Sequence, residues 1–236
     1  QEQVVRDGGS VALEREAVPA GDNVRYAGED CRRGDRILEP GILIGPAETG
    51  MLASVGVGEV TVTRQLRAAF FSTGDELTGV GTPLQPGQIY DSNRYSLFAL
   101  LSNAGVEVHD LGVIADDREA VRSAFRQATE IADLVITSGG VSVGDADFVT
   151  ATLQELGEVK LWRMAMKPGK PLAFGKLGDA WFFGLPGNPV SVMATFYQFV
   201  LPAIHKLSGL PDRQPLLIDA VAGEPFNKSP GRLEFQ

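Results

Sequence analysis

The sequence lacks several features that define particular classes of protein. With one cysteine, Cys31, and two histidines, it can form no internal disulfide and has no Cys/His spacing of a zinc site. Its net charge is −9, and it has no basic stripe of the kind that binds nucleic acid independently of sequence. The most apolar stretch, 190–204, is too short to span a bilayer comfortably and contains Gln198 and Pro202. We therefore expect neither a nucleic-acid partner nor a membrane partner.

The composition is that of an ordinary globular protein, with 44% hydrophobic and 22% charged residues in a chain of 236. That length predicts one or two domains. The single cysteine and the absence of a signal peptide indicate a reducing, cytoplasmic compartment. Since the chain begins at Gln1, and residues 229–236 are typical of the start of a new element, we expect a piece of a longer protein.

A stretch in the middle of the chain predicts an anion-binding loop. Residues 134–136 form a short, partly β-branched apolar run that is typical of a buried strand in a parallel sheet. The loop behind it, 137–144, is rich in glycine and serine, and a helix is expected over 148–156. Two adjacent glycines let backbone N–H groups approach a ligand closely, and a helix N-terminus favours an anion. A tight turn without a ligand is the alternative interpretation.

The pattern of the chain changes near residue 66. The first part predicts a hairpin over 4–14 with Asp7-Gly8 at its turn, a short helix over 46–55 and a strand over 59–63. Beyond it, strands alternate with helices, which predicts an α/β fold with a doubly wound sheet in three layers. The expected strands are 67–71, 106–113, 134–136, 159–166, 171–174 and 181–183, and the expected helices are 92–103, 116–131, 148–156 and 189–209.

Three of the predicted strands end in polar, glycine-rich loops. These loops are 72–76, 138–142 and 185–188. In doubly wound sheets, ligands bind beyond the carboxyl ends of the strands. We therefore expect the three loops to meet at one edge of the sheet and to form a site there.

Acidic side chains accumulate near the same predicted edge. We expect Asp116 to cap the helix behind it, with Glu119 three residues later as in a capping box. Glu76 has no capping role, and of Asp145 and Asp147 only one can cap the following helix, which leaves the other for a ligand. Clustered carboxylates can hold Mg²⁺ or transfer protons, although solvated loop acids are the simpler interpretation.

Basic side chains gather farther along the chain. Lys167 and Lys170 flank a Pro-Gly turn, and Arg163 lies on the strand before it. They offer positive charge for phosphate or another oxyanion, or they form an exposed basic hairpin. No His-Asp arrangement accompanies Ser138 or Ser142, which disfavours a serine nucleophile.

Five ordered motifs occur together. They are Phe71-Ser-Thr-Gly-Asp-Glu-Leu77, Gly87-Gln-Ile-Tyr-Asp-Ser-Asn-Arg94, Thr137-Ser-Gly-Gly-Val-Ser-Val-Gly144, Met166-Lys-Pro-Gly-Lys-Pro171 and Gly184-Leu-Pro-Gly-Asn-Pro-Val190. Together they resemble the bacterial MoeA family of molybdopterin molybdenumtransferases, to which the gephyrin E domain is related. Arg25 with Gly28-Glu-Asp30 resembles a further segment of that family.

The resemblance implies an enzyme of molybdenum cofactor biosynthesis. Such an enzyme inserts molybdate into adenylylated molybdopterin and releases AMP, with Mg²⁺ required. The resemblance also implies a homodimer whose active cleft lies between domains of both subunits, and a molybdopterin adenylyltransferase as a candidate partner. By this likeness the segments are part of a β-rich domain, a linking segment, the molybdopterin-binding α/β domain and the start of a C-terminal β domain, with bounds 1–34, 35–65, 66–212 and 213–236.

The motifs also assign roles to individual residues. The expected catalytic residues are Glu76, Asp116, Asp147 and Asp30, of which Asp116 and Asp147 are the expected metal ligands. The expected substrate-binding residues are Thr73, Gly74, Ser138, Gly139, Gly140, Ser142, Arg25, Arg163, Lys167, Lys170, Pro186 and Asn188.

The sequence departs from the family pattern in two respects, and two alternative functions are open at this point. Arg163 stands where the family often has lysine, and an N-terminal signature of the family is absent, so the chain by itself can be inactive. One alternative is a molybdopterin adenylyltransferase, which shares the α/β domain. The other is a binding or scaffold module without activity.

Overall fold

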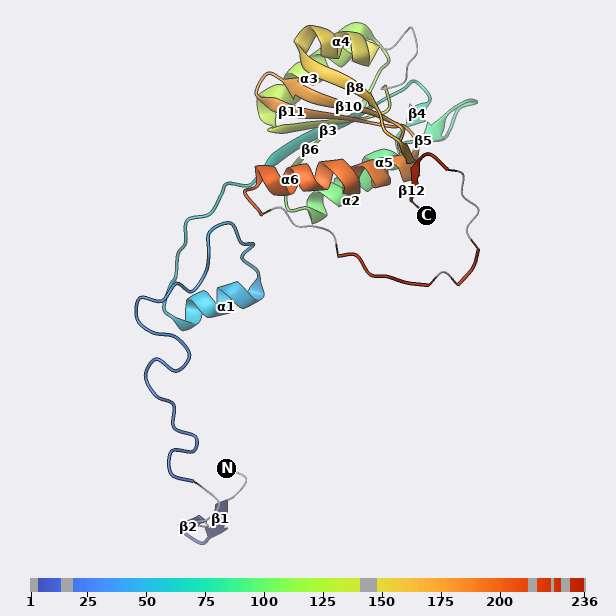
Figure 1. Cartoon of the computed structure of the whole chain (residues 1–236). Helices are drawn as coiled ribbons and strands as arrows, with labels where there is room; N and C mark the ends of the chain where they lie inside the picture. The colour runs from blue at the N-terminus through green and yellow to red at the C-terminus, as the bar shows by residue number, and fades with distance from the viewer. Residues whose placement is uncertain are drawn as a thin grey trace. The chain divides into compact units, whose positions relative to one another are not determined.

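The computed structural model describes residues 4–13, 19–140, 148–211, 216–221, 223–225 and 230–235 (Figure 1). The chain forms two compact units. The first comprises Gln1–Pro40 and Ile44–Gly58, and the second comprises Gly41–Leu43 and Glu59–Gln236. Each unit is considered by itself below.

The first unit contains the predicted hairpin and the predicted short helix. Strands β1 (Val4–Asp7) and β2 (Ser10–Leu13) pair antiparallel, with Asp7 opposite Ser10. The two-residue turn is therefore Gly8-Gly9 rather than Asp7-Gly8, and Gly8 has a φ of 57° that a tight hairpin turn favours in glycine. Helix α1 (Pro46–Ser54) has proline in its first turn, as expected.

The strand expected over 59–63 is wrong. These residues have exposed side chains and adopt no strand. Their sequence alternates between polar and apolar residues, but a strand also needs a neighbour with which to exchange hydrogen bonds. In the described ranges no strand pairs with this segment.

The second unit is built on a six-stranded sheet with the order β6-β3-β7-β11-β10-β8. Strands β6, β3, β7 and β11 run parallel, whereas β10 is antiparallel to both β11 and β8. The strand bounds are Arg67–Thr73 for β3, Glu107–Ile114 for β6, Leu134–Ser138 for β7, Gly157–Arg163 for β8, Pro171–Leu177 for β10 and Ala180–Leu185 for β11. The sheet is thus mixed, with a parallel centre.

Helices cover both faces of this sheet, which confirms the three-layer α/β architecture (Figure 1). On one face lie α2 (Ser92–Asn103) and a continuous helical rod made of α5 (Pro189–Thr195), the π-helical turn η1 (Phe196–Val200) and α6 (Leu201–Leu207). On the other face lie α3 (Arg118–Ile131) and α4 (Phe148–Leu156). Each face has its own core, because alternate strand residues point to opposite sides, as Phe70 and Phe71 do.

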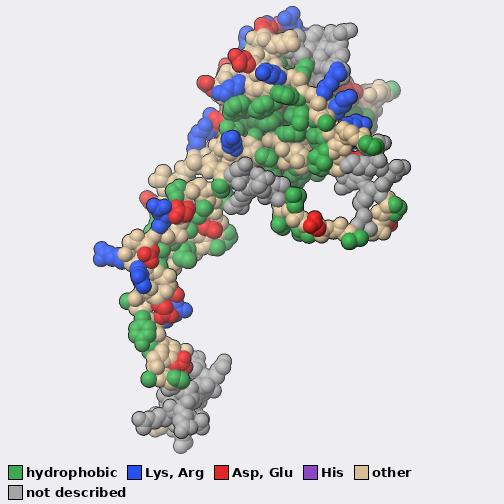
Figure 2. All heavy atoms as spheres, viewed as in Figure 1, with side chains coloured by type: hydrophobic (Ala, Val, Ile, Leu, Met, Phe, Trp, Pro, Cys, Tyr) green, Lys and Arg blue, Asp and Glu red, His purple; other side chains and the backbone are tan. Residues whose placement is uncertain are grey.

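The surface of the second unit carries apolar side chains between the helices α4 and α6 (Figure 2). The outer strand β8 has two exposed apolar residues, Leu161 and Trp162. Beside it, the rings of Phe174 and Trp181 stack with 5.6 Å between their centroids. No helix in the described ranges combines the length and the apolar character that crossing a bilayer requires.

Two short strand pairs flank the main sheet. Strand β4 (Leu77–Thr78) pairs with β5 (Ile89–Tyr90), and β9 (Met166–Lys167) pairs with β12 (Leu233–Glu234). Both pairs are parallel. They matter for the site because β4 follows the end of β3, and β9 follows the end of β8, at the carboxyl edge of the sheet.

The cap of α3 differs from the prediction by one residue. The carboxylate of Asp117 accepts hydrogen bonds from the backbone N–H groups of Glu119 and Ala120, at 3.0 and 2.9 Å. Asp117 is therefore the N-cap, and the expectation that Asp116 caps the helix is wrong. An N-cap side chain must reach the second or third amide of the helix, and Asp117 stands at that spacing. Asp116 is consequently left without a capping role.

Candidate functional site

The carboxyl ends of three adjacent strands bring the predicted loops together. In the parallel register, Ser138 of β7 lies opposite Ser72 of β3 on one side and Leu185 of β11 on the other. The loops that follow these strands therefore begin at the same level of the sheet. The predicted convergence of the three loops is confirmed.

The first two residues of the loop after β7, Gly139 and Gly140, occupy positions that require glycine. Gly139 and Gly140 have φ angles of 86° and 65°, which side chains rarely tolerate. A Cβ atom on Gly140 would lie 2.5 Å from Cγ2 of Val149 and 2.8 Å from Oγ1 of Thr73. A Cβ atom on Gly139 would lie 3.0 Å from the carbonyl oxygen of Thr73. The backbone of this loop is thus packed directly against the end of β3.

The rest of this loop, 141–147, lies outside the described residues. It includes two predicted site residues, Ser142 and Asp147. Their roles stay predictions.

Asn93, in the first turn of α2, connects two of the loops. Its amide nitrogen Nδ2 donates to Oγ of Ser138 at 2.8 Å and to the carbonyl oxygen of Gly187 at 2.7 Å. Sequence reasoning did not single out this residue. The available signals were its place in the motif 87–94 and its position four residues before the buried Leu97, where an apolar residue is expected.

Four hydroxyl side chains lie buried at the same edge: those of Ser72, Thr73, Thr137 and Ser138. Within the described part of the chain, Ser72 Oγ and Thr137 Oγ1 have no hydrogen-bond partner. The same is true of Oδ1 of Asn93. Buried polar atoms are normally paired, and unpaired ones at a loop-lined edge indicate a place where a ligand or water supplies the partner.

The predicted acids of this edge come from β3 and from the segment after β6. The carboxylate of Glu76 folds back over Gly74, since a Cβ atom on Gly74 would lie 2.5 Å from Oε2 of Glu76. Gly74 therefore permits the observed position of Glu76. The backbone N–H of Asp116 donates to Oδ1 of Asp75 at 3.2 Å. The structure thus brings together Asp116 and Asp75, and all three acids are exposed.

The described residues offer no complete metal site. No group of three or more histidine, cysteine, aspartate or glutamate side chains in the described ranges could hold a metal ion. The contact between Asp75 and Asp116 runs through the backbone N–H of Asp116, so it does not by itself bring their two carboxylates together as metal ligands. The expectation that Asp116 and Asp147 are metal ligands stays a prediction.

The three predicted cations of the basic turn lie at the same edge as the loops. Arg163 at the end of β8 pairs in register with Pro171 at the start of β10, and this end of β10 is level with the carboxyl end of β11. Arg163, Lys167 and Lys170 are exposed. They therefore place positive charge at this edge, on the side of the sheet next to the loop after β11.

Lys167 has an ion-pair partner that sequence reasoning missed. Its Nζ lies 2.7 Å from Oε1 of Glu234, a residue of the short strand β12. The side chain of Glu234 is 10% exposed and that of Lys167 is 60% exposed. The pairing of β9 with β12 brings these side chains together, and neither strand has a periodic pattern long enough to be recognised.

The loop after β11 contributes Pro186 and Asn188. Pro186 is buried, and Asn188 is the predicted N-cap of α5, with its side-chain oxygen accepting from the backbone N–H of Ser191 at 3.2 Å. Capping accounts for Asn188 in structural terms, and a contact of it with substrate stays a prediction. Thr73 and Gly74, at the end of β3, line the loop edge as described above.

Arg25 and Asp30 belong to the first unit. They are exposed and form an ion pair with each other. Their assignment to the site stays a prediction.

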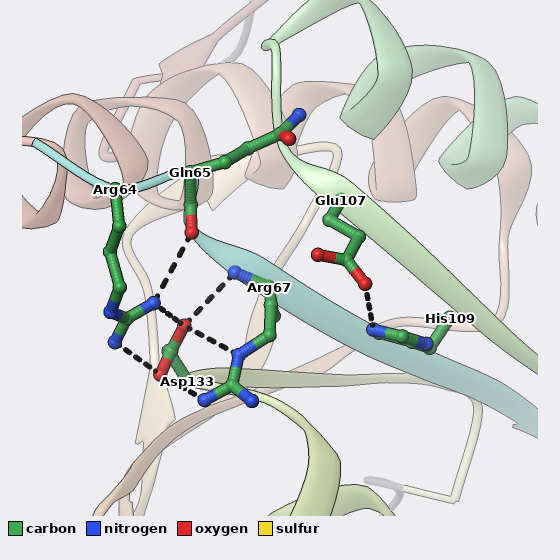
Figure 3. A network of polar contacts seen from close by, with 6 residues as sticks. All are labelled: Arg64, Gln65, Arg67, Glu107, His109 and Asp133. Carbon is green, nitrogen blue, oxygen red and sulfur yellow. Dashed lines mark hydrogen bonds and ion pairs between the residues drawn. The ribbon is translucent and has the colours of Figure 1, made fainter.

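The opposite, amino-terminal edge of the sheet has a closed ion-pair network (Figure 3). The carboxylate of Asp133 accepts two hydrogen bonds from the guanidinium of Arg64, at 2.7 and 2.8 Å, and one at 3.0 Å from the backbone N–H of Arg67. The Arg64 and Arg67 guanidinium groups hold the pKa of Asp133 well below its usual range. The carboxylate correspondingly raises the pKa of Arg64. These charges are satisfied by one another.

Each of the two units contains a segment that matches a known protein-family model. A family model described as the MoeA N-terminal region (domain I and II) matches residues 1–56. A model described as a probable molybdopterin-binding domain matches residues 69–206, which is more than half of the chain.

Relatives and solved structures agree with these matches. A molybdopterin molybdenumtransferase of Haemophilus influenzae is 49% identical over 237 residues, which cover 100% of this chain and 59% of that protein. Molybdopterin molybdenumtransferase 2 of Mycobacterium tuberculosis is 36% identical over 238 residues and is covered to 58%. A crystal structure of a MoeA protein from Pyrococcus horikoshii superposes with a TM-score of 0.71 at 35% identity, covering 88% of this chain and 52% of that one.

The chain therefore spans a little over half the length of the curated relatives described here, at 59% and 58%. The model of the MoeA N-terminal region comes first along the chain, and the model of the molybdopterin-binding domain follows it. On these grounds, the chain belongs to the MoeA family of molybdopterin molybdenumtransferases.

Proposed function

We propose that this protein acts in molybdenum cofactor biosynthesis by inserting molybdate into adenylylated molybdopterin, with release of AMP. The observation that carries the proposal is the convergence of three glycine-rich loops at one sheet edge, next to unpaired buried polar atoms and exposed cations. Both substrates are oxyanions, and this edge has the donors that oxyanions require. The names of the relatives support the same chemistry.

In this proposal, the loop after β7 binds the phosphate of the pterin substrate. Gly139 donates its N–H to the carbonyl oxygen of Leu185 at 3.1 Å, which ties the loop to the end of β11, and Gly140 keeps the left-handed backbone that lets the loop approach a ligand closely. The hydroxyl of Ser138, at the end of β7, is a donor. The following helix, α4, adds the favourable field of its N-terminus.

The cations beside the loops bind the second oxyanion, molybdate. Lys167 is the main candidate from the family motif, because its side chain stays 60% exposed although it pairs with Glu234. Arg163 and Lys170 add positive charge from the neighbouring strand ends. A pterin phosphate and a molybdate bound this close need such charge to offset their mutual repulsion.

The acids Glu76 and Asp116, with Asp147, take the proton-transfer and metal-binding roles. Mg²⁺, when bound, would neutralise charge on the phosphate that leaves with AMP. Glu76 is held over Gly74 and is free of any capping duty, so it can hold or deliver a proton at the departing oxygen. Asp116, which does not cap α3, is available as an oxygen ligand.

Two further assignments follow from the family likeness. We propose a homodimer, to be tested by light scattering on the full-length protein, and a cytoplasmic location. The adenylyltransferase alternative is less well supported, because residues 1–56 match the MoeA N-terminal region.

The proposal is tested by calorimetric titration and turnover assays on the full-length protein with adenylylated molybdopterin, molybdate and Mg²⁺. Lys167→Ala should lower molybdate-dependent turnover strongly. Lys176→Ala removes the same charge from an exposed side chain on the same sheet, but near the opposite edge, and should leave turnover unchanged. Absence of AMP release by the wild type, or equal losses in both variants, would contradict the proposal.

A further inference from the structure

Asn93 occupies a position in α2 that a purely structural helix would fill with an apolar side chain. The buried residues of α2 are Asn93, Leu97, Leu100 and Leu101, which form one stripe facing the sheet. Asn93 is 8% exposed, and it is the polar member of this stripe. A polar group in such a position is unfavourable unless its hydrogen bonds are needed.

The hydrogen bonds of Asn93 fix the orientation of its amide. The carbonyl oxygen of Gly187 can only accept, so the group that lies 2.7 Å from it must be the Nδ2 donor. The same Nδ2 lies 2.8 Å from Oγ of Ser138. An amide nitrogen carries two hydrogens, so both are used in joining the loop after β7 to the loop after β11.

This arrangement also sets the role of the Ser138 hydroxyl. Because Ser138 Oγ accepts from Asn93, its own proton is left to donate to another acceptor. No hydrogen bond donated by that hydroxyl is found within the described part of the chain. The hydroxyl lies at the start of the glycine loop that leads to the N-terminus of α4, and a helix N-terminus favours an oxyanion as the acceptor.

We infer that Asn93 is a positioning residue, which holds the two ligand loops in register and turns the Ser138 hydroxyl into a hydrogen-bond donor for the phosphate of the bound pterin. The inference rests on the proposed function, since it assumes that the loop after β7 binds that phosphate. Oδ1 of Asn93 is buried without a partner among the described residues, and as an acceptor it does not itself bind the phosphate.

The test is a double-mutant cycle in the full-length protein with Asn93→Ala, Ser138→Ala and the double variant. The probes are the dissociation constant for adenylylated molybdopterin by calorimetry, the split of turnover into kcat and KM, and the melting temperature. Each single variant should weaken binding roughly ten- to a hundredfold, because a hydrogen bond to a charged group is lost. Since Asn93 acts through Ser138, the double variant should bind little worse than Ser138→Ala alone.

Two further variants keep the test decisive. Asn93→Asp preserves the shape of the side chain, cannot donate to Gly187 and Ser138, and should weaken binding at least as much as Asn93→Ala. Asn103→Ala, at the exposed end of the same helix, is the matched control and should leave binding unchanged. If Asn93→Ala does not fold, Asn93→Ser, which keeps a donor on a shorter side chain, replaces it in the cycle.

The outcomes separate the inference from the proposed function. Additive losses in the cycle, or a lower melting temperature with unchanged affinity, would overturn the role of Asn93 while the proposed function stands. A wild-type protein that binds no adenylylated molybdopterin would overturn both. Strong coupling between the two positions, with the control unchanged, would support the inference.

Discussion

The two edges of the central sheet differ in how their polar groups are satisfied. At the amino-terminal edge, the carboxylate of Asp133 accepts from the guanidinium groups of Arg64 and Arg67 and from the backbone N–H of Arg67, so this charge has its partners within the protein (Figure 3). At the carboxyl edge, buried oxygen atoms of Ser72 and Thr137 have no partner within the described ranges. The same sheet therefore has one edge where the carboxylate of Asp133 is paired by neighbouring arginines and one edge where buried hydroxyl groups are left without a partner among the described residues.

This difference assigns a role in stability to the amino-terminal edge and a role in ligand binding to the carboxyl edge. A closed ion-pair network stabilises the fold and leaves nothing for a ligand, whereas unpaired buried polar atoms are unfavourable for folding and are explained when a ligand supplies the missing partners. The carboxyl edge also carries the conformational demands, because Gly139 and Gly140 adopt φ angles that other residues rarely adopt. Substitutions at one edge should therefore affect activity, and substitutions at the other should affect stability.

The largest effect is expected from removing the carboxylate of Glu76 at the carboxyl edge. Glu76→Gln keeps the shape of the side chain but removes the proton-transfer group, and molybdate insertion should fall by about 10²- to 10⁴-fold with an unchanged melting temperature. Asp147→Asn should have a similar effect. Glu130→Gln, an exposed acid of α3, is the control for the loss of one charge. Full activity of Glu76→Gln would contradict the assigned role.

The next effect concerns the glycine loop itself. Gly140→Ala places a Cβ atom 2.5 Å from Val149 in a left-handed backbone, and should destabilise the protein by about 2–4 kcal/mol while weakening substrate binding. Gly178→Ala has a similar φ of 59° but meets no atom within 4 Å, so it isolates the backbone strain, about 1–2 kcal/mol. Denaturant unfolding of both variants measures the difference. Equal destabilisation would show that the loop is not packed as described.

A smaller effect on stability, without an effect on activity, is expected at the amino-terminal edge. Asp133→Asn removes the charge that Arg64 and Arg67 share, and should lower the free energy of unfolding by about 1–3 kcal/mol. Asp179→Asn, an exposed residue in the turn at the same edge, should change it by less than about 0.5 kcal/mol. Loss of molybdate insertion in correctly folded Asp133→Asn would contradict the claim that the amino-terminal edge affects stability alone.

The smallest effect is the pH dependence of the stabilisation that Asp133 provides through its ion pairs with Arg64 and Arg67. The pKa of Asp133 in the folded state is depressed below its unfolded value of about 4, so the stabilisation is fully present above that value. It is lost as the pH falls through the folded-state pKa, because protonation removes the charge that the arginines bind. The stability difference between wild type and Asp133→Asn should be constant from about pH 5 to 7 and shrink below about pH 4. A difference that grows on acidification would contradict this assignment.

The strand and helix pattern of the second unit, and the edge that carries the site, could be predicted from the sequence. The apolar run 134–136, followed by glycines, predicts a buried strand, and the structure extends that strand to Ser138. The strand over 59–63 was wrong because alternation does not create a pairing partner. The cap at Asp117 was misplaced because adjacent aspartates are equivalent in sequence and only the backbone geometry distinguishes them.

The parts that could not be predicted depend on contacts between distant segments. Asn93 meets Ser138 across 45 residues, and Lys167 meets Glu234 across 67 residues. No local pattern indicates either contact, since both arise from the packing of α2 on the sheet and from the pairing of β9 with β12. The site residues carried over from the family motifs stay predictions until they are tested.

The difference between the two edges is tested most directly by one paired measurement on the full-length protein. The affinity for adenylylated molybdopterin and the melting temperature are measured for Ser138→Ala and for Asp133→Asn. We predict that Ser138→Ala loses at least about tenfold in affinity with a nearly unchanged melting temperature, and that Asp133→Asn melts lower with unchanged affinity. Equal affinity losses in both variants, or an unchanged affinity in Ser138→Ala, would contradict the assignment of binding to the carboxyl edge.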